Sequence, residues 1–158
     1  MEKPKYNKTF VIKKYIRDEM SRFKNFDNLT SFVDSLNLRE SKMLLRLLSK
    51  WRKNPVYRQV TSKDKWYLDW ISIDKIKVNL INNDINPLLD KNEFLLSKIA
   101  KDKEICNHSE FRIQREIKNE TILAFKVENY FRVIDGNHRI IRMACDGYIS
   151  FSLLYKKL

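Results

Sequence analysis

Glycine is nearly absent from this chain, and its scarcity limits where the backbone can turn sharply. Only two of the 158 residues are glycines, Gly136 and Gly147, and both lie within residues 131–155. Glycine is the residue that adopts positive φ angles without steric cost. We therefore expect left-handed turns at these two positions.

The sequence around each glycine predicts a different role for it. YFRVI (130–134) has the β-branched and aromatic content of a strand, and HRIIRMAC (138–145) has the apolar spacing of a helix. Gly136 lies between them, where a bare backbone lets a ligand approach and where the amides and positive dipole end of a helix favour an anion. Gly147 follows the last helical residue, the usual C′ position for a left-handed residue. We expect Gly136 to be functional and Gly147 to be structural.

Polar side chains flank Gly136 on both sides. Asn137 would cap the helix, and His138 and Arg139 would place phosphate donors at its mouth. Asp135 would act as a metal ligand or general base, or would be an ordinary turn aspartate, and His138 would serve in proton transfer or simply pack. Arg142, one turn further on, would extend the phosphate cradle or remain solvated.

The pattern of the chain changes near residue 66. Helical spacing of apolar residues predicts helices over residues 12–23 and 29–36, the second with Asp27 as its N-cap. Short apolar strands separated by helices follow. We expect an α+β or α/β protein, with a basic helical region at 1–65 followed by a small mixed-sheet domain at 66–158.

Within the second part, turn residues and β-branched runs define the expected elements. Helices are expected from Asp90 and Glu93 through Phe94, Leu95 and Ile99, and over 109–118. The expected strands cover residues 70–78, 121–127, 130–134 and 148–155.

A third N-terminal helix carries the clearest basic pattern. Asn37 and Glu40 form a capping box, and the helix is expected to run to about Asn54. Its apolar face is expected to hold Met43, Leu44, Leu47, Leu48 and Trp51. Another face would be a nucleic-acid-binding stripe or a solvated surface, and it holds Arg39, Lys42, Arg46, Lys50 and Lys53. Aromatic residues near its end would stack on bases or belong to the core: Trp51, Tyr57 and Trp66.

The net charge of +12 favours anionic partners, because a basic protein attracts phosphate polymers through its summed field. Residues 1–60 carry 15 basic and 6 acidic side chains, a net charge of +9, and residues 61–158 carry 17 and 14, a net charge of +3. We expect nucleic acid as a partner, or a protein with an acidic surface. No run approaches the roughly 20 apolar residues of a membrane span, and the first residues lack the apolar core of a secretory signal. A cytoplasmic location without membrane association is expected.

Cys106 and Cys145 are too few for a disulfide framework, so reduced thiols are expected. With His108 and His138 they would form a Cys2His2 set, but their spacing matches no standard zinc finger. No metal site of this kind is expected.

The segment VIDGNHR, followed by a helix, the tripeptide DGY and a closing strand, resembles the ParB/sulfiredoxin-like superfamily. The resemblance covers residues 68–156. Members bind nucleotides or phosphorylated groups at this turn, and some are nucleotide hydrolases, kinases or nuclease-like proteins. The resemblance implies that Gly136, His138 and Arg139 face a phosphate and that Asp135 lies near a metal or a substrate hydroxyl. Mg²⁺ and a nucleoside triphosphate are the cofactors that it implies.

Two residues depart from the family pattern. Asn137 stands where sulfiredoxins have their reactive cysteine, so that chemistry is not expected. Partition-type members have an acid at that place and a small residue at the position of Arg142, which counts against their form of CTP hydrolysis. The sequence leaves three functions open. They are phosphotransfer or phosphodiester hydrolysis near nucleic acid, non-catalytic nucleic-acid binding, and inhibition of a protein partner by a phage or mobile-element protein.

Overall fold

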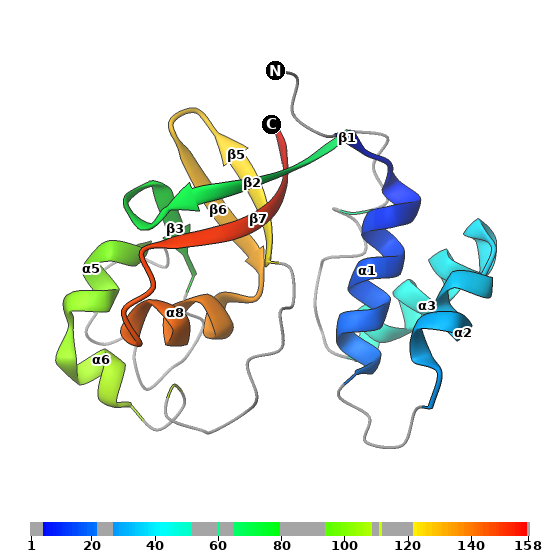
Figure 1. Cartoon of the computed structure of the whole chain (residues 1–158), viewed down its shortest axis with the longest axis horizontal. Coiled ribbons are helices and arrows are strands. Elements are labelled where there is room, and N and C mark those ends of the chain that lie inside the picture. Colours follow the sequence, from blue (N-terminus) through cyan, green and yellow to red (C-terminus); the bar gives the residue numbers. More distant parts are fainter. Residues whose placement is uncertain are drawn as a thin grey trace. The chain divides into compact units, whose positions relative to one another are not determined.

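The computed structural model describes residues 5–21, 27–51, 65–79, 94–108 and 122–157, together with residues 60 and 111. The chain divides into two compact units, Glu2–Trp66 and Tyr67–Leu158, and each is described by itself (Figure 1).

The N-terminal unit contains the short strand β1 (Lys5–Tyr6) and the helices α1 (Lys8–Met20), α2 (Leu29–Ser35) and α3 (Leu38–Trp51). The three helices confirm the three that the apolar spacing predicts, and α1 packs against both α2 and α3. The buried residues of α1 lie on one face, as an amphipathic helix requires. They are Val11, Ile12, Tyr15, Ile16, Glu19 and Met20.

The start of α2 differs from the expected one. Asn28, with a φ of 58°, is the N-cap, and Asp27 lies one residue too early for that role. Asparagine tolerates the left-handed conformation that this entry into the helix uses. A salt bridge of 3.1 Å from Arg17 Nη1 to Asp34 Oδ1 ties α1 to α2.

The C-terminal unit is built on a mixed sheet. Its neighbouring strands follow the order β2-β7-β5-β6-β3-β4. β5 and β6 form an antiparallel hairpin, β7 runs parallel to β5, β3 runs parallel to β6, and β4 is antiparallel to β3. Helices combined with this sheet confirm the α+β class. The strands are β2 (Trp66–Ser72), β3 (Ile76–Val78), β4 (Phe94–Leu95), β5 (Ile122–Val127), β6 (Tyr130–Asp135) and β7 (Ser150–Lys157).

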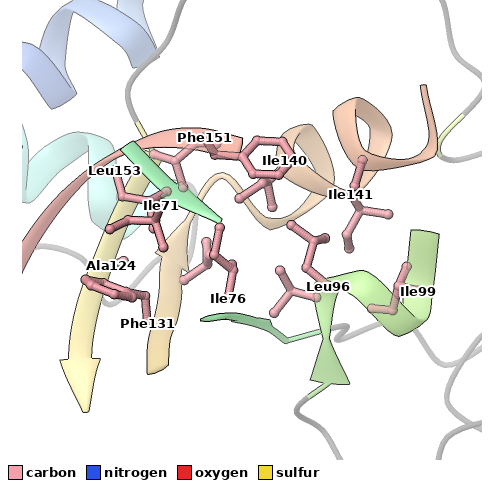
Figure 2. Packing of buried hydrophobic residues seen from close by; sticks show 14 of the residues in the cluster. Ile71, Ile76, Leu96, Ile99, Ala124, Phe131, Ile140, Ile141, Phe151 and Leu153 are labelled. Carbon is pink, nitrogen blue, oxygen red and sulfur yellow. The ribbon is translucent and has the colours of Figure 1, made fainter. Parts of the chain in front are cut away.

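Three helices cover one face of this sheet, α5 (Leu96–Lys101), α6 (Lys103–Asn107) and α8 (Asn137–Cys145) (Figure 1). Figure 2 shows Ile140 of α8 close to Phe151 of β7, with Leu96 of α5 turned toward Ile76 of β3. Alternate residues of the strands reach this core, as the period of two in a strand requires. The helix layer and the sheet therefore fix α8 firmly, and with it the turn that precedes it.

Several expected elements change in detail. The strand expected over 70–78 is interrupted by the 3₁₀ helix η1 (Ile73–Lys75), and Phe94 and Leu95 form a strand, so the helix begins only at Leu96. Helix α6 lies in a segment for which the sequence predicts no helix or strand. Asp90, Glu93 and most of 109–118 lie outside the described residues.

Gly147 has the structural role that the sequence predicts. Its φ is 98°, and its amide donates to Ala144 O at 3.0 Å while the amide of Tyr148 donates to Met143 O at 3.1 Å. These two bonds form the Schellman motif that closes a helix in a left-handed residue. Nothing lies within 4 Å of a Cβ added at Gly147, so only its backbone conformation calls for glycine.

Candidate functional site

The junction of β6 and α8 contains the main predicted site residues. β6 ends at Asp135, Gly136 turns the chain with a φ of 94°, and α8 begins at Asn137. The amide of Ile140 donates to Gly136 O at 3.0 Å, so the amides of residues 137–139 precede the first bond of the α-helix. Gly136 offers them no capping side chain. The first turn of α8 therefore has the amide and dipole arrangement that favours an anion.

Asn137 does not cap this helix, so that expectation is wrong. Asn137 is the first helical residue, and its Oδ1 accepts a hydrogen bond of 3.0 Å from the amide of Asn79, just after β3. A side chain inside the first turn points back along the helix and is too late to cap it. Asn137 instead joins the ends of β3 and α8.

The bare Cα of Gly136 is covered, contrary to the expectation that a ligand approaches it there. A Cβ added to Gly136 would lie 3.3 Å from Ile122 Cγ1 and 3.6 Å from Nη1 of Arg139. Ile122 begins β5 and is buried. The glycine is thus needed both for its positive φ and for close packing. An anion would approach the amide side of the turn.

The side chains of Arg139 and His138 differ in position and in burial. Arg139 folds its guanidinium toward Gly136, and its Nη1 is buried. His138 is exposed, and its ring centroid lies 5.8 Å from that of Phe111. Asp135 and Arg142 are half-buried. Arg139 therefore lies beside the Gly136 turn, whereas the His138 ring lies beside Phe111.

The edge of the sheet beside α8 gathers further polar groups. β3 and β6 are parallel, so Asn79 and Asp135 come at the carboxyl ends of neighbouring strands. The side-chain oxygen of Asn79 is buried and accepts no hydrogen bond within the described part of the chain. Leaving a buried carboxamide unsatisfied costs about 1–3 kcal/mol. A polar ligand at this edge would offset that cost.

The two cysteines are joined, so the expectation of reduced thiols is wrong for this structure. A disulfide links Cys106 of α6 to Cys145 of α8, with a Cα–Cα distance of 5.5 Å. Bonded sulfur atoms are not thiolate ligands, and within the described residues no group of three or more His, Cys, Asp or Glu side chains is placed to hold a metal. The disulfide fixes the last residue of α8 to α6.

The predicted capping box of α3 is confirmed, and its predicted apolar face is confirmed only in part. Asn37 N donates to Glu40 Oε2 at 2.8 Å, and Glu40 N donates to Asn37 Oδ1 at 2.9 Å. Leu48 is buried and Leu44 is half-buried, as predicted, and Leu45 is buried as well. Met43 and Leu47 are instead 58% and 63% exposed, because the helix buries Ser41 and Ser49 and so turns a different face inward. Four of the five predicted basic residues are described, Arg39, Lys42, Arg46 and Lys50. Lys53, Tyr57 and the side chain of Trp51 lie outside the described set, and Trp66 is fully buried.

The structure contains a second basic cluster, on the sheet, that the sequence does not predict. The strand register aligns Lys77, Arg132, Phe125 and Lys156 in one row across β3, β6, β5 and β7. Paired residues project from the same sheet face, so Lys77 lies beside Arg132. Phe125 separates Arg132 from Lys156, which is buried. Lys77 Nζ lies 3.7 Å from the centroid of Tyr130, and Arg132 Nη2 lies 3.4 Å from Tyr130 Oη. Tyr130 and Arg132 alternate in YFRVI, so the sequence indicates that they share one face of a strand. The rest of the row depends on pairing between strands far apart in sequence.

A search of protein-family models, of curated proteins and of solved structures finds no match to this chain.

Proposed function

We propose that the C-terminal unit binds a nucleotide through its phosphate groups at the β6–α8 junction. The observation that carries the proposal is the meeting of three features at one sheet edge: the carboxyl ends of β3 and β6, and the first turn of α8. Ligands of α/β proteins bind in the same way beyond the carboxyl ends of parallel strands. The resemblance of VIDGNHR to the ParB/sulfiredoxin-like superfamily also supports it.

Each polar group would have a distinct role toward the nucleotide. The amides of the first turn of α8 would donate to the phosphate oxygens, and His138 and Arg139 would add charge-assisted bonds from either side. Asn79 Oδ1 is an acceptor, so it would take a hydrogen bond from a donor elsewhere on the same ligand, such as a ribose hydroxyl. Arg142 would contact a more distant phosphate, because it lies one helical turn beyond Arg139.

Mg²⁺ would fit this site only together with the nucleotide. Mg²⁺ is commonly held by one or two carboxylates plus substrate phosphates and water. Asp135 is a carboxylate at the junction, and the described residues offer no larger cluster of metal ligands. A bound Mg²⁺ would neutralise phosphate charge. Asp135 would either hold this Mg²⁺ or accept the proton of the attacking hydroxyl or water, and His138 would donate a proton to the leaving oxygen, in a phosphotransfer or phosphodiester hydrolysis.

A cytoplasmic location belongs to the same proposal, because nucleoside triphosphates and nucleic acids are concentrated there. In the described residues, none of the helices has the length and apolar content to cross a membrane. A reducing compartment would open the Cys106–Cys145 disulfide, so the redox state of this pair bears directly on the location.

Nucleotide binding is tested by titrating the whole protein with pyrophosphate and with each nucleoside triphosphate, in the presence of Mg²⁺. At a ligand concentration of a hundred times Kd we expect about 2.7 kcal/mol of added stability in a thermal melt. Arg139→Gln and His138→Ala should each weaken binding by about tenfold or more, because each removes a charge-assisted or polar contact with phosphate.

Lys101→Gln is the matched control, since it removes one exposed positive charge from α5, away from the junction. Its affinity should equal that of the wild type. Melts without ligand separate lost folding from lost binding in the Arg139 variant. The proposal fails if no nucleotide or pyrophosphate stabilises the protein, or if Arg139→Gln and His138→Ala both bind as tightly as the control.

Nucleic acid is the second ligand that we propose, and the pair formed by Lys77 and Arg132 beside Tyr130 favours it. Two half-buried cations beside an aromatic ring suit a phosphate backbone and the bases attached to it. Lys77→Gln combined with Arg132→Gln should lower the affinity for a single-stranded oligonucleotide by about tenfold. It should also reduce the slope of log affinity against log salt by about 0.7 for each phosphate that the variant no longer neutralises.

The matched control removes two exposed lysines from the helix layer, Lys98→Gln with Lys103→Gln. Fluorescence anisotropy at several salt concentrations measures both doubles. If the two double variants lose affinity for the oligonucleotide equally, only the net charge matters, and Lys77 and Arg132 have no specific role.

A further inference from the structure

We propose that the exposed face of α3 docks an acidic amphipathic helix of a partner protein. This face is called the α3 stripe. Its residues recur at the spacing of one helix face, and they are Arg39, Lys42, Met43, Arg46, Leu47 and Lys50.

The α3 stripe exposes apolar side chains next to charged ones, although the core of the unit uses a different face of the same helix. Met43 and Leu47 are 58% and 63% exposed, whereas Leu45 and Leu48 supply the buried face of the same helix. Exposed apolar residues that lie together mark interaction surfaces. Methionine adapts its flexible side chain to irregular partners, which makes it common at such surfaces.

The four cations of the stripe are available to a partner. Arg39, Arg46 and Lys50 are exposed and Lys42 is half-buried, and within the described part of the chain none of them makes an ion pair. The single acid of α3, Glu40, is engaged in the capping box with Asn37. With about 100° between successive residues of an α-helix, the four cations lie together on one side of Met43 and Leu47, and within the described residues no acid pairs with them.

An open hollow on the stripe itself gives the partner a place to lay a side chain. It has a volume of about 450 Å³, and its described lining consists of Leu38, Arg39, Lys42, Met43 and Arg46. Binding energy in helix-in-groove complexes is concentrated in a few apolar anchors of this kind, spaced three or four residues apart. An apolar ridge with Asp and Glu alongside it would match the hollow and the cations together.

Other occupants fit the stripe less well. A nucleic-acid backbone would leave Met43 and Leu47 against phosphates, since aliphatic side chains offer no ring on which a base stacks. A second copy of this chain, docked face to face, would bring the same four cations together, and like charges juxtaposed in this way are unfavourable.

The test uses a synthetic helical peptide that has leucines at positions i, i+3, i+4 and i+7 and glutamates on the flanking positions. A peptide of the same composition in scrambled order has the same charge without the apolar ridge. Fluorescence anisotropy with the full-length protein should give at least tenfold tighter binding of the amphipathic peptide. Met43→Ser with Leu47→Ser should remove most of that preference.

The matched control is Tyr148→Ser with Ile149→Ser, because these residues are 54% and 75% exposed but belong to the C-terminal unit. It should bind the amphipathic peptide like the wild type. Lys42→Gln with Arg46→Gln should weaken both peptides, since it removes the charge attraction common to them. Circular dichroism melts check that each variant remains folded.

Three results would overturn the inference. The first is equal affinity for the two peptides, which would reduce the stripe to a charged surface. The second is an unchanged peptide affinity in the Met43 and Leu47 double variant. The third is competition by an oligonucleotide or by anionic phosphatidylserine vesicles that depends on Met43 and Leu47, which would assign the stripe to nucleic acid or membrane. Because the β6–α8 junction is in the other unit, none of these outcomes decides nucleotide binding.

Discussion

Gly136→Ala is expected to lower the free energy of unfolding by about 2–3 kcal/mol, more than the same change at Gly147. Both glycines have positive φ angles, 94° and 98°, which cost an L-residue about 1–2 kcal/mol. Only at Gly136 would the new Cβ also press on Ile122 Cγ1, at 3.3 Å. Overpacking a well-filled core adds about 1–3 kcal/mol. Urea unfolding with an unchanged m-value measures the difference.

Asparagine variants separate the two causes. Asparagine tolerates the left-handed conformation, so Gly147→Asn should be close to neutral, because nothing lies within 4 Å of its Cβ. Gly136→Asn should still lose stability, since its Cβ meets the same isoleucine. Equal costs for alanine at the two positions would show that packing against Ile122 contributes nothing, and that only φ requires glycine.

These two glycines also show how much of the fold the sequence predicts. The strand, turn, helix and second turn from residue 130 to residue 147 are correct because their signals are local: β-branched residues, Asp-Gly, apolar spacing and a C′ glycine. The capping box of α3 is correct for the same reason. Hydrogen bonds within three or four residues of each other are encoded by adjacent residues.

The errors concern contacts between distant residues. The predicted apolar face of α3 contains Met43 and Leu47 together with Leu48. Packing in the N-terminal unit buries Leu48 with Leu45 and leaves Met43 and Leu47 exposed, and the spacing of the residues does not decide between these faces. Tertiary context overrides such patterns in a short amphipathic helix. The covered Cα of Gly136 likewise depends on Ile122, which belongs to a different strand.

The candidate site was predicted as a set of adjacent residues and not as an arrangement in space. Asp135 to Arg139 could be located from the sequence because they surround one glycine. Asn79 could not, since it is 58 residues from Asn137, to which its amide donates. The row across the sheet is hidden in the same way, because Lys77 and Arg132 meet only through the parallel pairing of β3 with β6.

Reduction of the Cys106–Cys145 disulfide is expected to cost about 4 kcal/mol of folding free energy. The two residues are 39 apart in sequence, and closing a loop of that length removes roughly this much entropy from the unfolded chain. Urea unfolding with and without a reductant measures the loss. The double variant Cys106→Ala with Cys145→Ala should match the reduced protein and should not respond to the reductant.

The same disulfide connects stability to the proposed nucleotide site. Cys145 is the last residue of α8, and the opposite end of that helix carries Asn137, His138 and Arg139. Ile140 and Ile141 are fully buried in the core, and the disulfide cysteines are not among the buried residues of that core, so the reduced helix should stay docked on the sheet. We therefore expect reduction to lower the unfolding midpoint strongly while nucleotide affinity changes little. A thiol assay on protein unfolded without reductant should find no free thiol. Two free thiols, or an unfolding midpoint that reductant leaves unchanged, would mean that the pair is a dithiol and that packing alone holds α6 against α8.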